Sequence, residues 1–285
     1  MKIAFLLMFV LVGCSKRQQT IIQNKGSDTL VNLAQAWAEE YKTVVPTVGI
    51  AVSGGGSGTG IAALINGTVD IANSSRAMKE EEKATALKNN GKQVKEFVVG
   101  LDALAVFVHP ANPLTGLSLE ELACIYGEGG KCNLWSDVRP GTTVPGCQDN
   151  KIIRVSRQSN SGTYEYFREA IQGPGKDLKG GSMDLNGSRE SIDLVGKTPC
   201  AIGYSGMGYI TKDVKALCVS TTKEGACVAP TVETATDKTY PIARELYMYT
   251  SGEPSAEVQA FMDWTQTDKA RELTISSGFV PVPKN

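Results

Sequence analysis

The chain has 285 residues, of which 41% are apolar and 21% charged, and its formal net charge is −1. This length favours two domains, and the composition excludes a disordered chain or a coiled coil. The balanced charge also argues against nucleic acid as a partner, because proteins that bind the phosphate backbone usually carry a strong basic excess. Any anion site must therefore be local.

The first residues predict export. Residues 1–13 join Lys2 to a short apolar run, which is far below the roughly 20 residues that span a bilayer and is typical of a secretory signal. The Leu-Val-Gly-Cys sequence ending at Cys14 resembles the bacterial lipobox. We therefore expect cleavage before Cys14, lipidation of its thiol and a polar tether over residues 14–20. An ordinary signal with an incidental cysteine is the alternative.

Strands and helices then alternate along the chain. Strands are expected at residues 21–26, 48–52, 68–72, 94–99, 101–108, 152–155, 201–204 and 246–249. Helices are expected at residues 30–41, 60–65, 79–89, 119–126, 164–171 and 257–265. This alternation predicts α/β units with a parallel sheet core, in which ligands bind at the carboxyl ends of the strands.

Three loops place small hydroxyl residues where a helix should begin. They are Gly26 to Leu30 (with Ser27, Asp28 and Thr29), Gly54 to Gly60 (with Ser57) and Arg157 to Thr163 (with Ser161 and Gly162). Helix N-termini carry unpaired N–H groups and partial positive charge, and an arginine can fork onto two oxygens, so the set predicts a site for a tetrahedral oxyanion. Simple N-capping, a flexible Gly/Ser turn and a solvent-facing arginine are the alternatives.

A fourth loop is less decisive. Ser75 and Arg76 follow a predicted strand and are expected to contact the ligand, with pairing of Arg76 to a nearby carboxylate as the alternative. The glycine-rich loop lacks the lysine of a P-loop, which disfavours nucleotide hydrolysis.

Catalysis finds little support in the sequence. The only histidine, His109, adjoins a proline in a predicted loop, and no serine completes the G-x-S-x-G elbow. Residues 80–82, three glutamates, are interpreted as a solvated helix face. We therefore expect no enzyme, no cofactor and no metal.

Six cysteines remain once Cys14 is set aside. They are Cys124, Cys132, Cys147, Cys200, Cys218 and Cys227. An even number in an exported chain favours disulfides over thiol chemistry, and six cysteines allow 15 pairings. Cys218 and Cys227 flank a glycine-containing turn and could close a hairpin. Zinc is the weaker interpretation, since no CxxC pair occurs.

Taken in order, these motifs resemble the periplasmic phosphate-binding proteins of bacterial phosphate ABC transporters, which have the type 2 solute-binding fold. The resemblance also includes residues 199–204 and 278–281. It implies two α/β lobes with mixed or parallel sheets: lobe I from residues 21–102 and 243–285, and lobe II from residues 103–242. The hinge would lie near residues 100–102 and 241–244.

The resemblance also implies which residues contact phosphate. They are Thr29, Leu30, Ser57, Arg157, Ser161, Gly162 and Thr163. One position departs from the family, because Ser75 stands where well-known members have an aspartate that accepts the proton of hydrogen phosphate. A site built around such an acceptor rejects ligands that cannot donate to it, so selectivity over sulfate is open. Our hypothesis is that Asp28 supplies the acceptor.

The sequence thus predicts a lipid-anchored binding protein of the periplasm or cell envelope. It would capture inorganic phosphate between its lobes and deliver it, as a monomer, to the permease subunits of an ABC transporter in the inner membrane. The alternatives are a protein for sulfate, molybdate or tungstate, an exported phosphohydrolase using Ser57 or Ser161, and a phosphate sensor or surface adhesin on the same fold.

Overall fold

The computed structural model describes residues 19–283, so the predicted signal peptide and Cys14 lie outside the described residues. The strands are β1 Thr20–Gly26, β2 Val48–Ser53, β3 Ile71–Ser74, β4 Val94–Val108, β5 Gly116–Ser118, β6 Ile153–Arg157, β7 Met183–Leu185, β8 Ala201–Gly206, β9 Lys215–Ser220 and β10 Ala243–Ser251. Thr20, predicted as the last tether residue, already belongs to β1.

Helices flank these strands. They are α1 Val31–Val44, α2 Ser57–Ile65, α3 Glu80–Asn90, α4 Leu119–Tyr126, α5 Trp135–Val138, α6 Gly162–Gln172, α7 Ser188–Lys197, α8 Val232–Thr236, α9 Ala256–Trp264 and α10 Asp268–Ser276, with a 3-10 turn η1 at Met207–Tyr209. Among residues 19–283, every helix falls short of the length or apolar character of a membrane span.

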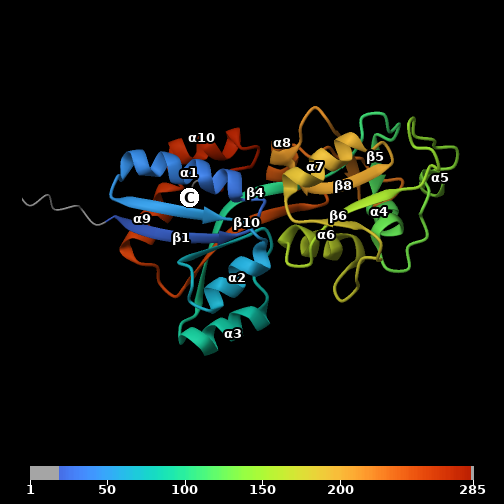
Figure 1. Ribbon diagram of the computed structural model, residues 1–285. Helices are drawn as coiled ribbons and strands as arrows, with labels where there is room; N and C mark the ends of the chain where they lie inside the picture. The colour runs from blue at the N-terminus through green and yellow to red at the C-terminus, as the bar shows by residue number, and fades with distance from the viewer. Residues whose placement is uncertain (1–18, 284–285) are drawn as a thin grey trace, which may run out of the picture.

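The strands form one curled mixed sheet in the order β2-β1-β3-β10-β4-β8-β6-β7, with β5 and β9 attached off this path. Strand β4 pairs with β10 as far as Ala103 and with β8 from Leu104. Two bodies result, joined by β4 and β10 (Figure 1). We call the body that contains β1–β3 lobe I and the body that contains β5–β9 lobe II.

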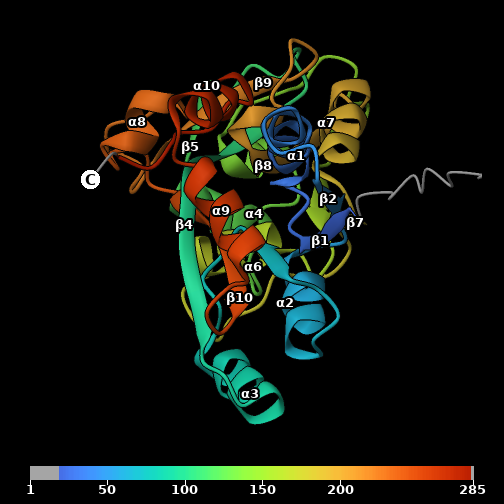
Figure 2. The same cartoon turned by 90° about the vertical axis from the view of Figure 1, so that its left-hand side faces the viewer.

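Each lobe has its own apolar core. In lobe I, helices α1, α9 and α10 pack over the sheet around Trp37, which is fully buried and donates its indole N–H to the carbonyl of Ala270 at 3.0 Å. In lobe II, Tyr126 and Trp135 occupy the corresponding centre. Seen from the lobe I end, β4 runs as one long strand toward α3 at the bottom of the view (Figure 2). The predicted α/β class and two-lobed architecture are confirmed.

Two details of the prediction were wrong. Residues 94–99 and 101–108 form a single strand, because Gly100 continues the pairing with β10 opposite Leu246. The sheet also has an antiparallel centre, since β10 pairs antiparallel with β3 and β4. Several elements were not predicted: β5, α5, β7, α7, β9, α8 and α10.

Three disulfides lie in lobe II. They join Cys124 to Cys132, Cys147 to Cys200 and Cys218 to Cys227. The last closes the hairpin expected from its turn, where Val219 and Val228 form an antiparallel bridge. Cys147–Cys200 ties the long connection before β6 to the start of β8, across a sequence separation of 53 residues.

Candidate anion-binding site

The three hydroxyl-rich loops meet between the lobes. The hydroxyls of Thr29, before α1 in lobe I, and Thr163, in the first turn of α6 in lobe II, lie 3.0 Å apart. Ser57, at the start of α2, accepts a hydrogen bond from the Ser75 backbone N–H at 3.1 Å, and the two serine hydroxyls are 3.4 Å apart. Helix starts that are distant in sequence therefore converge on one place.

Gly162 lies against this serine pair. A Cβ added at Gly162 would stand 2.3 Å from the Ser57 hydroxyl and 2.9 Å from that of Ser75. Only a glycine lets the start of α6 approach so closely. The N-terminus of a lobe II helix thus directly adjoins two lobe I hydroxyls.

The Thr29 and Ser57 hydroxyls of lobe I do not cap the helices that they precede or begin. Helices α1 and α2 have no side-chain cap, and Thr29 and Ser57 instead direct their hydroxyls to Thr163 and Ser75. Ser161, in contrast, is the N-cap of α6 and accepts from the Tyr164 N–H at 3.4 Å. Simple N-capping therefore explains Ser161 and leaves Thr29 and Ser57 unexplained.

The backbone of the first loop is held from within. Ser27 is buried, and its N–H donates to the carbonyl of Asn73 at 2.9 Å. The N–H of Leu30 donates to the Ser27 carbonyl at 3.1 Å, while the Leu30 side chain is fully buried in the lobe I core. These bonds position Thr29 between the two lobes.

Arg157, at the end of β6, is buried with 1% exposure. Its guanidinium donates to the carbonyls of Leu185 and Asn186, to the Ser188 hydroxyl at 3.1 Å and to the Asp28 carboxylate at 3.3 Å. Burial lowers the pKa of Arg157, and Asp28 acts against this change. The contact with Asp28 is an ion pair between the lobes.

Asp28 has further partners. One carboxylate oxygen accepts from the Gly55 N–H at 3.0 Å, the other from Arg157, and the Asp28 carbonyl accepts from the Tyr209 hydroxyl at 2.6 Å. The carboxylate is thus fixed between the glycine-rich loop and lobe II, beside the converging hydroxyls.

Arg76 is committed elsewhere. Its guanidinium forks onto Glu82 at 2.6 and 2.8 Å, which is the alternative carboxylate pairing and not the expected ligand contact. Burial opposes the ionisation of Glu82, but the bonds from Arg76 and from the Lys79 N–H hold its pKa below the usual value. The interpretation of residues 80–82 as a solvated face is therefore wrong for Glu82.

Sequence reasoning missed a buried ion pair on the hinge strands. Arg244 of β10 donates to one oxygen of Asp102 of β4 at 2.8 and 3.0 Å. The same guanidinium reaches the Thr29 and Thr163 hydroxyls at 3.3 and 3.2 Å and the Ser75 carbonyl at 3.2 Å. Burial raises the pKa of the Asp102 carboxyl, and Arg244 opposes the rise. The sequence feature that could have predicted this pair is the presence of one acidic and one basic residue in two largely apolar strands.

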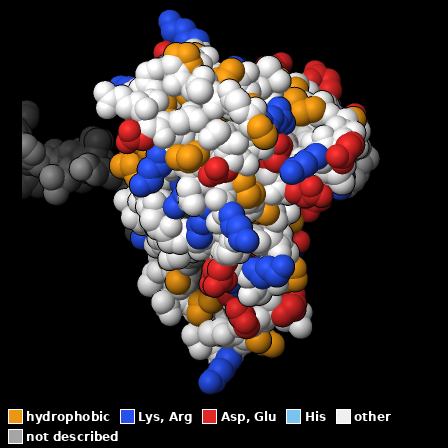
Figure 3. All heavy atoms as spheres, turned by 90° about the vertical axis from the view of Figure 1, so that its right-hand side faces the viewer, with side chains coloured by type: hydrophobic (Ala, Val, Ile, Leu, Met, Phe, Trp, Pro, Cys, Tyr) orange, Lys and Arg blue, Asp and Glu red, His pale blue; other side chains and the backbone are white. Residues whose placement is uncertain are grey.

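The formal charges at the site balance. Arg157 and Arg244 supply two positive charges, and Asp28 and Asp102 supply two negative ones. On the end face of lobe II, Lys and Arg side chains are likewise interspersed with Asp and Glu (Figure 3). Recognition of an anion must therefore come from directed hydrogen bonds rather than from net charge.

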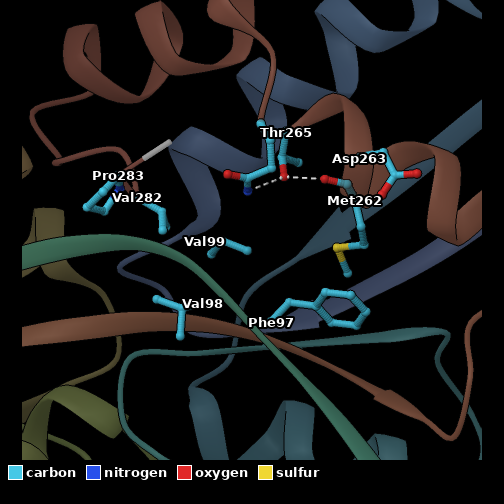
Figure 4. A pocket seen from close by; sticks show the side chains of 9 residues that line it. Phe97, Val98, Val99, Met262, Asp263, Thr265, Val282 and Pro283 are labelled. Carbon is cyan, nitrogen blue, oxygen red and sulfur yellow. Dashed lines mark hydrogen bonds between the residues drawn. The ribbon is translucent and has the colours of Figure 1, made fainter. Parts of the chain in front are cut away.

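A separate pocket lies away from these residues. It occupies about 480 Å³ in lobe I, between β4, the end of α9 and the C-terminal segment. Phe97, Val99 and Met262 give it an apolar wall, and its Thr265 hydroxyl is held by the Met262 carbonyl at 2.7 Å (Figure 4). Its chemistry does not suit an oxyanion. Within residues 19–283, no cluster of three or more His, Cys, Asp or Glu side chains could hold a metal ion.

Comparison with known proteins agrees with this geometry. Residues 15–269 match the PBP superfamily domain. The phosphate-binding protein PstS of Pseudomonas aeruginosa is 32% identical over 269 residues, which cover 92% of this chain and 83% of that protein. Protein SphX of Synechococcus elongatus is 32% identical over 278 residues, covering 93% and 79%.

Solved structures give the same result. A substrate-binding protein assigned to a phosphate ABC transporter of Clostridium perfringens, with bound phosphate, has a TM-score of 0.81 at 27% identity and covers 93% of this chain and 100% of its own. An ABC-type phosphate transport receptor of Vibrio cholerae has a TM-score of 0.71 at 27% identity, covering 92% and 100%. The chain therefore belongs to the PBP superfamily and, within it, to the PstS-like family of solute-binding proteins.

Proposed function

We propose that the chain is an extracytoplasmic binding protein that captures inorganic phosphate between its lobes and hands it to an ABC permease. The observation that carries this proposal is the convergence of Thr29, Ser57, Gly162 and Thr163 from both lobes on one buried place. The choice of phosphate as the ligand is supported by relatives and structural neighbours that are named for phosphate binding. A binding role rather than catalysis is supported by the hydrogen bond that Ser57 accepts from the Ser75 N–H.

Hydrogen bonds from the protein can account for the free energy of binding a buried phosphate. Burying an unpaired dianion would cost tens of kcal/mol, so hydroxyls, helix N–H groups and guanidinium must together replace its water. A micromolar dissociation constant needs only about −8 kcal/mol net. In this proposal the ligand is held by Thr29, Leu30 and Ser57 of lobe I, by Ser75, and by Arg157, Ser161, Gly162 and Thr163 of lobe II.

Binding would be coupled to lobe closure. We assign residues 21–102 and 243–285 to one moving body and residues 103–242 to the other, a division supported by the change of partner in β4 between Ala103 and Leu104. Closure would bring Arg157 and the start of α6 onto an anion already in contact with Thr29 and Ser57.

Location follows from the leader sequence. Cleavage before Cys14 and lipidation of its thiol would tether the chain to a membrane of the cell envelope, within reach of a permease. Replacing Cys14 with Ala should release the protein into the soluble periplasmic or secreted fraction. If the variant still sediments with membranes, the anchor is not this thiol.

Selectivity is the finer part of the proposal. Near pH 7 phosphate keeps a proton that sulfate lacks, and Asp28 is the carboxylate beside the hydroxyl loops that could accept it. We expect Asp28→Asn to reduce the preference for phosphate over sulfate. An unchanged preference would remove Asp28 from this role.

The direct test is calorimetry of the purified protein with phosphate, arsenate, sulfate and molybdate at two pH values. We expect micromolar or tighter binding of phosphate. Preferential binding of sulfate or molybdate would identify a different oxyanion carrier. Turnover of a chromogenic phosphate ester would instead indicate a phosphohydrolase.

A further inference from the structure

The Asp102–Arg244 pair lies where the two hinge strands face each other. The residues are direct register partners on β4 and β10, and they are 0% and 4% exposed. No hydroxyl-rich motif contains either of them. The pair therefore lies on the hinge strands and also contacts residues of the loops that meet between the lobes.

The N–H donors of Arg244 are divided between two kinds of acceptor. Three hydrogen bonds go to fixed acceptors, namely two to the Asp102 carboxylate and one to the Ser75 carbonyl. The other two go to the neutral hydroxyls of Thr29 and Thr163, at 3.3 and 3.2 Å. Those hydroxyls belong to opposite lobes and are candidate ligand contacts.

Exchange of these two hydroxyl acceptors for an anion oxygen would be favourable. A guanidinium N–H binds a charged oxygen about twice as strongly as a neutral one. Resting on the proposed function, we propose that Arg244 is a second guanidinium that contacts the bound oxyanion, and that Asp102 is its counter-charge and positioning residue.

The surroundings of Asp102 fit the positioning role. Its second carboxylate oxygen accepts from the Met207 N–H at 3.0 Å, which fixes the plane of the carboxylate. Gly206 permits this approach, since a Cβ there would lie 2.9 Å from Asp102 and 3.0 Å from Thr29. The ring of Tyr166 lies 5.8 Å from the Arg244 guanidinium. The guanidinium is therefore oriented before any ligand arrives.

The proposal predicts opposite effects for the two members of the pair. Asp102→Asn keeps the shape of the side chain but leaves the Arg244 charge uncompensated, so anion affinity should rise. Removing Arg244 alone would leave a buried carboxylate unpaired and could unfold the chain. The double variant Asp102→Asn/Arg244→Gln removes both charges at once and avoids this difficulty.

The experiment measures the binding of inorganic phosphate by calorimetry and thermal unfolding by circular dichroism. The control neutralises a different Arg–carboxylate pair, Arg139 and Glu121 in lobe II, which share hydrogen bonds of 3.0 and 3.2 Å. We expect affinity to rise by roughly threefold or more in Asp102→Asn, to fall by roughly tenfold or more in the double variant, and to stay within about twofold of wild type in the control Glu121→Gln/Arg139→Gln.

Each part of the proposal can fail separately. A folded double variant that binds phosphate like the wild type overturns the contact with Arg244. An Asp102→Asn variant with unchanged or weaker affinity overturns the counter-charge role. Wild-type protein that binds none of phosphate, arsenate, sulfate and molybdate overturns the proposed function and this proposal together.

Discussion

The contacts between the lobes divide into a floor and a rim. The floor consists of buried residues at most 4% exposed: Thr29, Ser57, Ser75, Asp102, Thr163 and Arg244. The rim includes an ion pair of 2.6 Å between Lys79 of lobe I and Glu165 of lobe II, whose side chains are 38% and 14% exposed. On the floor a low dielectric makes each polar contact strong, whereas water screens the rim. Under the proposed function, the floor is expected to decide which anion binds and the rim to adjust how readily the lobes close.

The largest loss of phosphate affinity is expected for Gly162→Ala, which disrupts the floor. The added Cβ would collide with the Ser57 and Ser75 hydroxyls, so the start of α6 would have to withdraw. Overpacking of about 3 kcal/mol corresponds to a roughly hundredfold loss of phosphate affinity by calorimetry. Gly180→Ala is the control, because nothing lies within 4 Å of its Cβ position. Near-normal binding by Gly162→Ala would mean that the floor is not the ligand site.

The next effect is that of Arg157→Ala. The change removes a buried guanidinium and leaves Asp28 without its partner in the other lobe. We expect a loss of phosphate affinity of roughly tenfold or more, as for a charge-assisted hydrogen bond of about 1.5–3 kcal/mol. Arg271→Ala, whose side chain contacts the Val282 carbonyl in lobe I, is the control. Unchanged affinity would remove Arg157 from the site.

At the rim the expected effect is smaller. Lys79→Met breaks the ion pair with Glu165, and a partly exposed pair of this kind contributes about 0.2–1 kcal/mol. Phosphate affinity should therefore fall by no more than roughly fivefold, measured at low salt. Lys83→Met breaks a pair with Glu80 within α3 and should have no effect. A tenfold or larger loss in Lys79→Met would erase the distinction between rim and floor.

The smallest effect concerns pH. Burial opposes the ionisation of Glu165, but Lys79, Arg76 and Arg168 lower its pKa below the usual value. A lowered pKa stabilises the folded state above about pH 4.3, the ordinary value of a glutamate, and this contribution is lost as pH falls through the lower folded value. In phosphate-free buffer, wild type should unfold at a higher temperature than Glu165→Gln at pH 7, and the gap should shrink as the pH is lowered below about 4.3. A constant gap would contradict this assignment.

Local signals made some elements predictable. Helix α4 has the predicted bounds Leu119–Tyr126, because Ser118 and Glu121 form a capping box before an apolar stripe. The hydroxyl loops were found for the same reason, since each combines small residues with a helix start. The sequence prediction divided strand β4 at Gly100, because glycine often interrupts a strand. In the fold, pairing of Gly100 with β10 keeps the strand continuous.

Arg244 was missed for a different reason. Its role depends on Asp102 of β4, 142 residues away, and on hydroxyls from both lobes. No local pattern encodes such a contact, and only the antiparallel register places the two charges opposite each other. Arg76 shows the reverse case, because a motif suggested a ligand contact while the fold supplied Glu82.

The pairing of β4 with β10 has a mechanical consequence. The two strands that connect the lobes are hydrogen-bonded to each other at Asp102 and Arg244, so the lobes can separate only by bending or twisting this ribbon. Asp102 and Arg244 belong to this ribbon, so they lie at the axis of such a motion. Opening would separate Thr163 from Thr29 and Glu165 from Lys79, whereas Asp102 and Arg244 stay paired on the connecting strands, so the Arg244 guanidinium is already in place when an anion enters the open cleft.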